Sequence, residues 1–108
     1  MRFPYGVAVV AGSSMQPHLY AGDCVVVRRR VRPQTGDVVL VRRPDRPELL
    51  IVKRVREVLS DGRLWLAGDN PSASDDSRLF GAVDPSVVEG RVVWRYRPLF
   101  RRGMVTED

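Results

Sequence analysis

The sequence predicts a mainly β fold, a compact, coiled, β-barrel-like domain with long loops and little helix. Short Val-rich runs recur between turn signals, which is the pattern of successive strands. Nine Gly and eight Pro occur without a period, as expected for many turns and not for a repetitive fibre. Because the chain has 108 residues, of which 44% are hydrophobic and 29% charged, we expect one globular domain over residues 1–108.

Six strands are predicted along the chain, and alternation is clearest in the last, where Val92, Trp94 and Tyr96 alternate with residues that are mostly arginine. The expected strands span residues 5–11, 23–30, 37–43, 49–59, 63–67 and 87–96. Helix is expected only as a turn after Ser14 and another around 85–87. A chain of short strands with so little helix favours a coiled sheet or barrel.

Turn signals indicate how these strands connect. Gly22-Asp23 and Gly36-Asp37 open two similar segments, so we expect the second and third strands to pair through a connection at 31–35. Asp61-Gly62 predicts a tight hairpin between the fourth and fifth strands.

Composition excludes several kinds of site. Cys24 is the one cysteine and His18 the one histidine, which rules out an internal disulfide framework and a multi-histidine metal centre. No run of 18 apolar residues occurs, so we expect no membrane-spanning helix. The expected location is therefore the cytoplasm or the periphery of a membrane.

Two polar loops, residues 12–18 and 68–81, are framed by Gly and Pro and do not resemble scaffold. Loops of this kind are where a rigid β scaffold presents chemistry. The first loop contains Ser14, held between Gly12 and Pro17, and a serine hydroxyl is a nucleophile only when a nearby base takes its proton.

Lys53 is the best candidate for that base. Of 18 basic residues, Lys53 alone is lysine, and it lies in the apolar stretch 49–55. Arginine keeps its proton in proteins, whereas a lysine desolvated by apolar neighbours such as Leu50, Ile51 and Val55 has a lowered pKa. A Ser14–Lys53 dyad is therefore the favoured chemistry.

Other catalytic arrangements fit less well. In a triad His18 would be the base for Ser14, but no second element holds the two together. Cys24 begins a Val-rich strand, where a thiol is inert. Asp75 and Asp76 are adjacent and so point apart, unlike the paired carboxylates of a glycosidase.

Three motifs, in order, resemble the bacterial signal peptidase I family. Ser14-Met15-Gln16-Pro17 is similar to its Ser-Met-x-Pro nucleophile box, and Val52-Lys53-Arg54-Val55 to its Lys-Arg box. The third box begins at Gly68-Asp69-Asn70 and continues with Ser74, Asp76, Ser77, Arg78 and Gly81. The small size and the Arg-rich segment 90–96 look most like the compact subgroup thought to mature nickel-type superoxide dismutase.

The resemblance implies a signal-peptidase/repressor-protease fold and a role for each matching residue. Ser14 would be the nucleophile, with its own N–H in the oxyanion hole, and Lys53 the general base and acid. Ser74 would orient the lysine, and Asp76 with Arg78 would stiffen the site.

Two further implications concern the edges of the site. Many family members use a serine hydroxyl two residues before the nucleophile as a second oxyanion donor, but this chain has Gly12 there. The candidate substitutes are the neighbouring Ser13, a water and a backbone group. Asp69 and Asn70 are expected to stabilise the site.

The implied activity is that of a serine endopeptidase that removes an N-terminal leader from a precursor protein, bound as an extended peptide. A nickel superoxide dismutase precursor is the candidate substrate. No metal and no organic cofactor is needed, nucleic acid is not an expected partner, and peripheral membrane contact is a possible one.

Two alternatives stay open. The same dyad occurs in self-cleaving repressors, but Ala11-Gly12 lies too close to Ser14 to fold back into the site. The other is an Arg-rich β module that binds nucleic acid or an anionic membrane without catalysis. In the membrane reading, the segment 99–102 would lie on the bilayer as an apolar wedge with basic flanks. Against nucleic acid, Trp65, Trp94 and Tyr96 are expected in the core.

Overall fold

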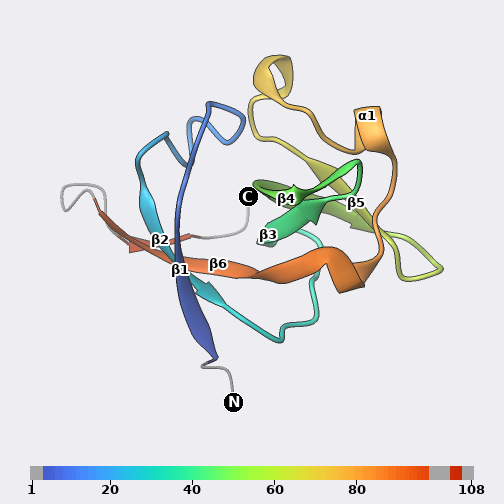
Figure 1. Cartoon of the computed structure of the whole chain (residues 1–108), viewed down its shortest axis with the longest axis horizontal. Coiled ribbons are helices and arrows are strands. Elements are labelled where there is room, and N and C mark those ends of the chain that lie inside the picture. The colour runs from blue at the N-terminus through green and yellow to red at the C-terminus, as the bar shows by residue number, and fades with distance from the viewer. Residues whose placement is uncertain (1–3, 98–102, 106–108) are drawn as a thin grey trace.

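The computed structural model describes residues 4–97 and 103–105, which confirm a mainly β fold (Figure 1). The strands are β1 (Tyr5–Val9), β2 (Cys24–Arg28), β3 (Val38–Arg43), β4 (Arg46–Val58), β5 (Leu64–Ala67), β6 (Val88–Arg97) and β7 (Gly103–Met104). The helical elements are the short α1 (Ser77–Phe80) and two 3₁₀ turns, η1 (Pro71–Ala73) and η2 (Pro85–Val87). The segment 99–102 lies outside the described residues.

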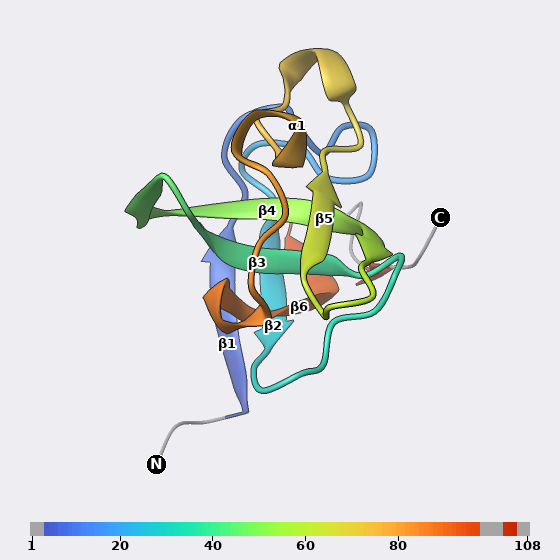
Figure 2. The same ribbon diagram turned by 90° about the vertical axis from the view of Figure 1, so that its right-hand side faces the viewer.

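All strands pair antiparallel in one sheet of order β1-β2-β6-β3-β4-β5, with β7 added beside β6. The start of β6 pairs with β3 and the rest of it with β2, so this strand joins two halves that cross each other (Figure 2). Gly90 lies where the halves meet. A Cβ there would come within 2.5 Å of Val27 Cγ1, so the close approach of β6 to β2 requires glycine.

The prediction that strands β2 and β3 pair with each other is wrong, because β6 lies between them. The repeated Gly-Asp pairs instead make the same turn twice. Asp23 Oδ2 accepts the N–H of Tyr20 at 2.9 Å, and Asp37 Oδ2 accepts the N–H of Gln34, also at 2.9 Å. Glycine at the preceding position supplies the positive φ that such turns need. The similar segments therefore reflect shared turn chemistry and not shared pairing.

The core has two parts, one in each half of the coiled sheet. The first contains the loop residues Val10, Met15 and Leu19 together with side chains of β2, β6 and the start of β3; the second lies over β3, β4 and β5. The prediction of Trp94 as core is wrong, since this side chain is 40% exposed. The register of β6 against β2 shifts between Val26 and Val27, so Trp94, opposite Val26, leaves the buried face that Val92 occupies.

The predicted turns are mostly confirmed. Leu19 N–H donates to Met15 O at 2.9 Å in one helical turn after Ser14, and η2 forms where predicted. The 59–63 segment closes the β4–β5 hairpin around Gly62. The sequence did not predict α1, whose N-terminus is capped by the Asp76 carboxylate.

Candidate active site

The loop that carries Ser14 is fixed from both sides. Buried Met15 anchors it to the core, being only 1% exposed. On the other side Asn70 holds it to the second polar loop: its backbone N–H donates to Ser14 O at 2.8 Å, and its side-chain Nδ2 donates to Ser13 O at 3.1 Å. Asn70, which belongs to the third motif, thus contacts the loop of the first motif directly, and these bonds fix the backbone of Ser14.

Lys53 lies on β4 and is 4% exposed. Its Nζ donates a hydrogen bond to Ser74 Oγ at 2.9 Å. Burial lowers the pKa of Lys53 from its ordinary value, and this outweighs the opposing effect of the Asp76 and Asp75 carboxylates. The expected desolvation by Leu50 is wrong, because that side chain is 51% exposed.

Ser74 connects the lysine to a buried carboxylate. Its Oγ donates to Asp76 Oδ2 at 3.2 Å, and Gly68 N–H donates to the same oxygen at 3.2 Å. Arg78 Nε binds the other oxygen, Oδ1, at 3.0 Å. Burial alone would raise the pKa of Asp76, but the hydrogen bonds from Arg78 and Gly68 hold it below the ordinary range. The carboxylate therefore stays charged and accepts from Ser74.

Gly68 lies at the closest contact between these parts. A Cβ at this position would lie 2.5 Å from Ser74 Cβ and 2.7 Å from Ser14 O, so any side chain would separate the serines. We expect Gly68→Ala to cost about 1–3 kcal/mol of stability through overpacking and to lower activity by displacing Ser74. Gly62→Ala is the control: Gly62 has φ 89° and open space around it, so this variant is strained without touching the site.

Thermal melts and activity per folded molecule test this expectation. A Gly68→Ala variant as active as Gly62→Ala would show that the close contact does not position Ser74.

A second buried network was not foreseen. Arg54, 1% exposed at the side chain, binds Asp69 with two bonds, Nε to Oδ1 at 2.9 Å and Nη2 to Oδ2 at 2.8 Å. His18 Nδ1 lies 2.8 Å from the same Oδ2. Burial acts to raise the pKa of Asp69, but Arg54 and His18 together lower it. His18 is thus engaged with Asp69 through Nδ1, and the pocket that Ser14 lines is also lined by Lys53 and not by His18.

This network joins the three motifs, since Arg54 follows Lys53, Asp69 precedes Asn70, and His18 ends the Ser14 loop. A signal for it was present: an arginine in an apolar stretch needs a buried carboxylate. As expected, Asp75 and Asp76 point apart, Asp75 binding Arg43 at 3.1 Å. Within residues 4–97 and 103–105, no three His, Cys, Asp or Glu side chains gather as a metal site.

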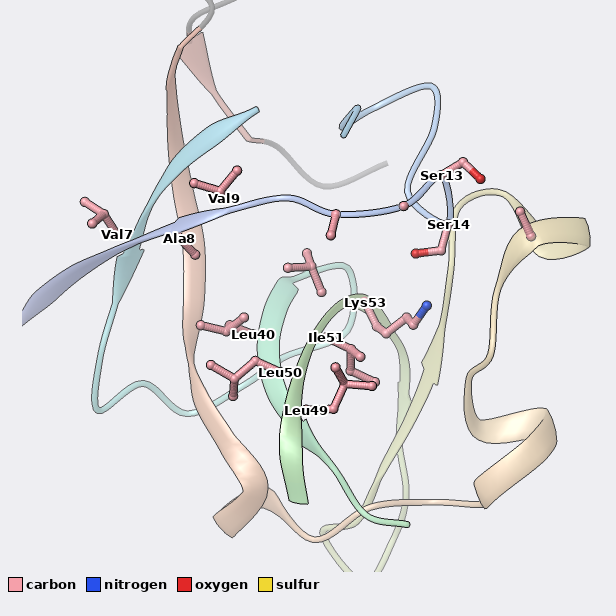
Figure 3. A pocket seen from close by; sticks show the side chains of 14 residues that line it. Val7, Ala8, Val9, Ser13, Ser14, Leu40, Leu49, Leu50, Ile51 and Lys53 are labelled. Atoms are coloured by element: carbon pink, nitrogen blue, oxygen red, sulfur yellow. The ribbon is translucent and has the colours of Figure 1, made fainter. Parts of the chain in front are cut away.

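A groove of about 560 Å³ passes the two candidate catalytic groups (Figure 3). At one end the Ser14 hydroxyl and the Lys53 amine point toward each other, whereas the Ser13 hydroxyl points away from both (Figure 3). The rest of the groove is apolar. Its walls come from β1, β3 and β4, and its lining includes Val7, Ala8, Val9, Leu40, Leu49, Leu50 and Ile51.

Residues 3–93 match the Peptidase S24-like family. The chain belongs to that family. The match spans all three motifs, including Ser14, Lys53 and the loop with Ser74. The predicted relationship to signal-peptidase-like proteases is therefore confirmed at the family level, while the nickel superoxide dismutase subgroup stays a prediction.

Relatives of this S24-like chain carry names of membrane proteases. Mouse mitochondrial inner membrane protease subunit 1 is 28% identical over 126 residues, covering 95% of this chain and 76% of the relative. The human protein of the same name is 30% identical over 117 residues, covering 87% and 70%. Arabidopsis mitochondrial ATP-independent inner membrane protease subunit 1a is 43% identical over 44 residues, covering 41% and 26%.

The S24-like chain shows no helix, among the residues that the structure describes, of the length and apolarity needed to cross a membrane. Peripheral attachment to a membrane stays a prediction.

Proposed function

We propose that this protein is a serine endopeptidase with a Ser14–Lys53 dyad that removes a leader from a precursor protein. One observation carries the proposal: Lys53 is buried, bonded to Ser74 Oγ at 2.9 Å, and opens onto the same groove as Ser14. Burial lowers the pKa of the Lys53 amine, so it gives up its proton and becomes a base more readily than an exposed lysine does.

In the proposed reaction, neutral Lys53 Nζ takes the hydroxyl proton as Ser14 Oγ attacks the scissile carbonyl. The carbonyl oxygen becomes an oxyanion, for which the Ser14 N–H is the proposed donor. Lys53 then gives its proton to the leaving amine as the C–N bond breaks. Water, deprotonated by Lys53, attacks the acyl-enzyme and releases the acid, returning the proton to Ser14 Oγ.

The second oxyanion donor is proposed to be a backbone group or water. Gly12 has no hydroxyl, and the Ser13 hydroxyl points away from the groove end (Figure 3). One missing donor can cost about 2.7–4 kcal/mol of transition-state stabilisation, so this protease is expected to be slow unless such a group substitutes.

The groove supports an extended, apolar substrate. β1 is an outer strand of the sheet, and a peptide that lies against it can add a strand. Lys53 is the one charged side chain among the groove's lining residues, so uncharged side chains near the scissile bond fit best. The binding-module alternative has weaker support, because several arginines are neutralised within the chain, such as Arg43 by Asp45 and Arg63 by Asp61.

The test is cleavage of a defined precursor. A nickel superoxide dismutase precursor is the substrate to try first, with intact mass spectrometry of both products. Cleavage at one bond by the parent and none by Ser14→Ala supports the proposal. A precursor left whole, together with no cleavage of unrelated leader peptides, argues against a processing protease.

Ser74→Ala should lower turnover about 10- to 1000-fold, because Lys53 loses the hydroxyl that positions it but remains a base. The fold should survive, since Asp76 keeps its bonds to Arg78 and Gly68. Single-turnover cleavage rates measure the effect. Ser72→Ala is the control, since Ser72 is exposed on the same loop and bonds Asn70. Equal rates in Ser74→Ala and the parent would remove Ser74 from the mechanism.

A further inference from the structure

The outer edge of β1 presents backbone groups to the groove. Where β1 meets the β2 segment, the paired groups belong to even-numbered residues: Pro4 O accepts a hydrogen bond at 2.7 Å, and Val10 N–H donates one at 2.8 Å. Antiparallel pairing alternates, so the N–H and C=O groups of Tyr5, Val7 and Val9 face the other way, toward the outer edge. These are the groups that a bound peptide strand would pair with.

Arg29 occupies the last acceptor on this edge. Its Nη1 donates to Tyr5 O at 2.8 Å. The guanidinium also lies close to Gly6, where a Cβ would come within 2.5 Å of Arg29 Nη2. Glycine at position 6 is therefore what lets the arginine cross the strand. A peptide paired along β1 meets free groups at Val9 and Val7 but a bonded carbonyl at Tyr5.

The same arginine lies where the groove ends. A second hollow, of about 130 Å³, shares Val7, Leu40 and Leu50 with the main groove and is lined beyond them by Gly6, Arg29 and other residues. The two hollows together run from Ser14 and Lys53 at one end to Arg29 at the other.

We propose that Arg29 is the end stop of the substrate groove and limits the peptide segment recognised along β1. The inference rests on the proposed function. Ala11 follows Gly6 by five positions, and an extended chain rises roughly 3.3 Å per residue, so the paired peptide segment is about five residues long, counted from the scissile bond. Residues farther along the peptide meet the guanidinium and gain no backbone bond.

Peptide length is the variable that tests this proposal. The probes are fluorescent alanine-rich peptides extended one residue at a time on either side of a central Ala-Ala bond. Their affinities are measured by anisotropy with Ser14→Ala protein, which does not turn over. We expect affinity to rise up to about five residues on one side and then stay constant.

In Ser14→Ala/Arg29→Met, the methionine keeps an apolar stem over Gly6 but frees Tyr5 O. The rise should then continue for one or two further residues, adding about 2- to 10-fold in affinity, the worth of about one hydrogen bond. Ser14→Ala/Arg28→Met is the matched control. It loses the same charge at the neighbouring residue, which bonds the Tyr5 hydroxyl at 2.9 Å and not its carbonyl, so its length limit should not move.

Three results would overturn the proposal. The length limit could be the same with and without Arg29, it could shift equally in the Arg28 control, or affinity could be independent of peptide length. Thermal melts establish whether each variant is folded. If the Arg29→Met variant is unfolded, the Arg29→Gln variant is used for the same measurement. Cleavage of the same peptides by the parent separates the two ideas. A shifted limit without cleavage contradicts only the protease function, and cleavage with an unshifted limit contradicts only the role of Arg29.

Discussion

Lys53→Arg should reduce precursor cleavage by about 10⁴- to 10⁶-fold, the loss seen when a catalytic base that acts with its nucleophile is removed. The substitution keeps a positive charge and nearly the same length. A guanidinium stays protonated, however, so it cannot accept the proton of Ser14. Cleavage rates of purified protein measure the loss, and near-parental activity in this variant would make Lys53 an ordinary structural cation.

Stability separates a catalytic lysine from a structural one. Because burial lowers the folded-state pKa of Lys53, the amine binds fewer protons in the folded than in the unfolded chain. Burying this amine therefore lowers the free energy of unfolding. The loss is complete below the folded-state pKa, shrinks as pH rises toward the ordinary value of 10.5, and is absent above it. Lys53→Met should therefore be inactive but at least as stable as the parent near neutral pH. A clearly less stable Met variant in a thermal melt contradicts this.

Ser14→Ala should lose cleavage by a similar factor of about 10⁴ to 10⁶ while remaining folded. The reason is chemical, since the attacking oxygen is gone. The loop keeps its anchors, because Asn70 binds the carbonyls of Ser13 and Ser14 and not their hydroxyls.

Ser13→Ala is the control for this prediction, because its hydroxyl points away from Lys53 (Figure 3). It should retain most of the activity. Turnover that persists in Ser14→Ala and disappears only when Ser13 is also replaced would move the nucleophile to Ser13.

Local patterns predicted most of the strands, because Val-rich runs and Gly-containing turns are properties of neighbouring residues. The position of β6 between β2 and β3 is a long-range property. It depends on the close packing of Gly90 against Val27, which no local pattern reveals. The exposure of Trp94 is likewise not a local property, because it follows from the register shift of β6 against β2 between Val26 and Val27.

The candidate catalytic residues were easier to predict than the buried network of side chains that surrounds them. Residue type and apolar context made Ser14 and Lys53 candidates, and the family resemblance of their motifs selected them. The Arg54–Asp69–His18 network was missed because its members lie far apart in the sequence and meet only when the two polar loops pack. The role proposed for Arg29 likewise depends on a strand edge that exists only in the fold.

The most direct test of the dyad is the pKa of Lys53 itself, because the chain contains one lysine. Protein labelled with ¹³C- and ¹⁵N-lysine gives one side-chain signal, whose shift can be followed with pH while cleavage is measured in the same buffers. We predict a midpoint below 10.5 that coincides with the pH at which kcat/KM rises. A lysine that titrates near 10.5, or a rise in kcat/KM at a pH unrelated to its midpoint, would contradict Lys53 as the base.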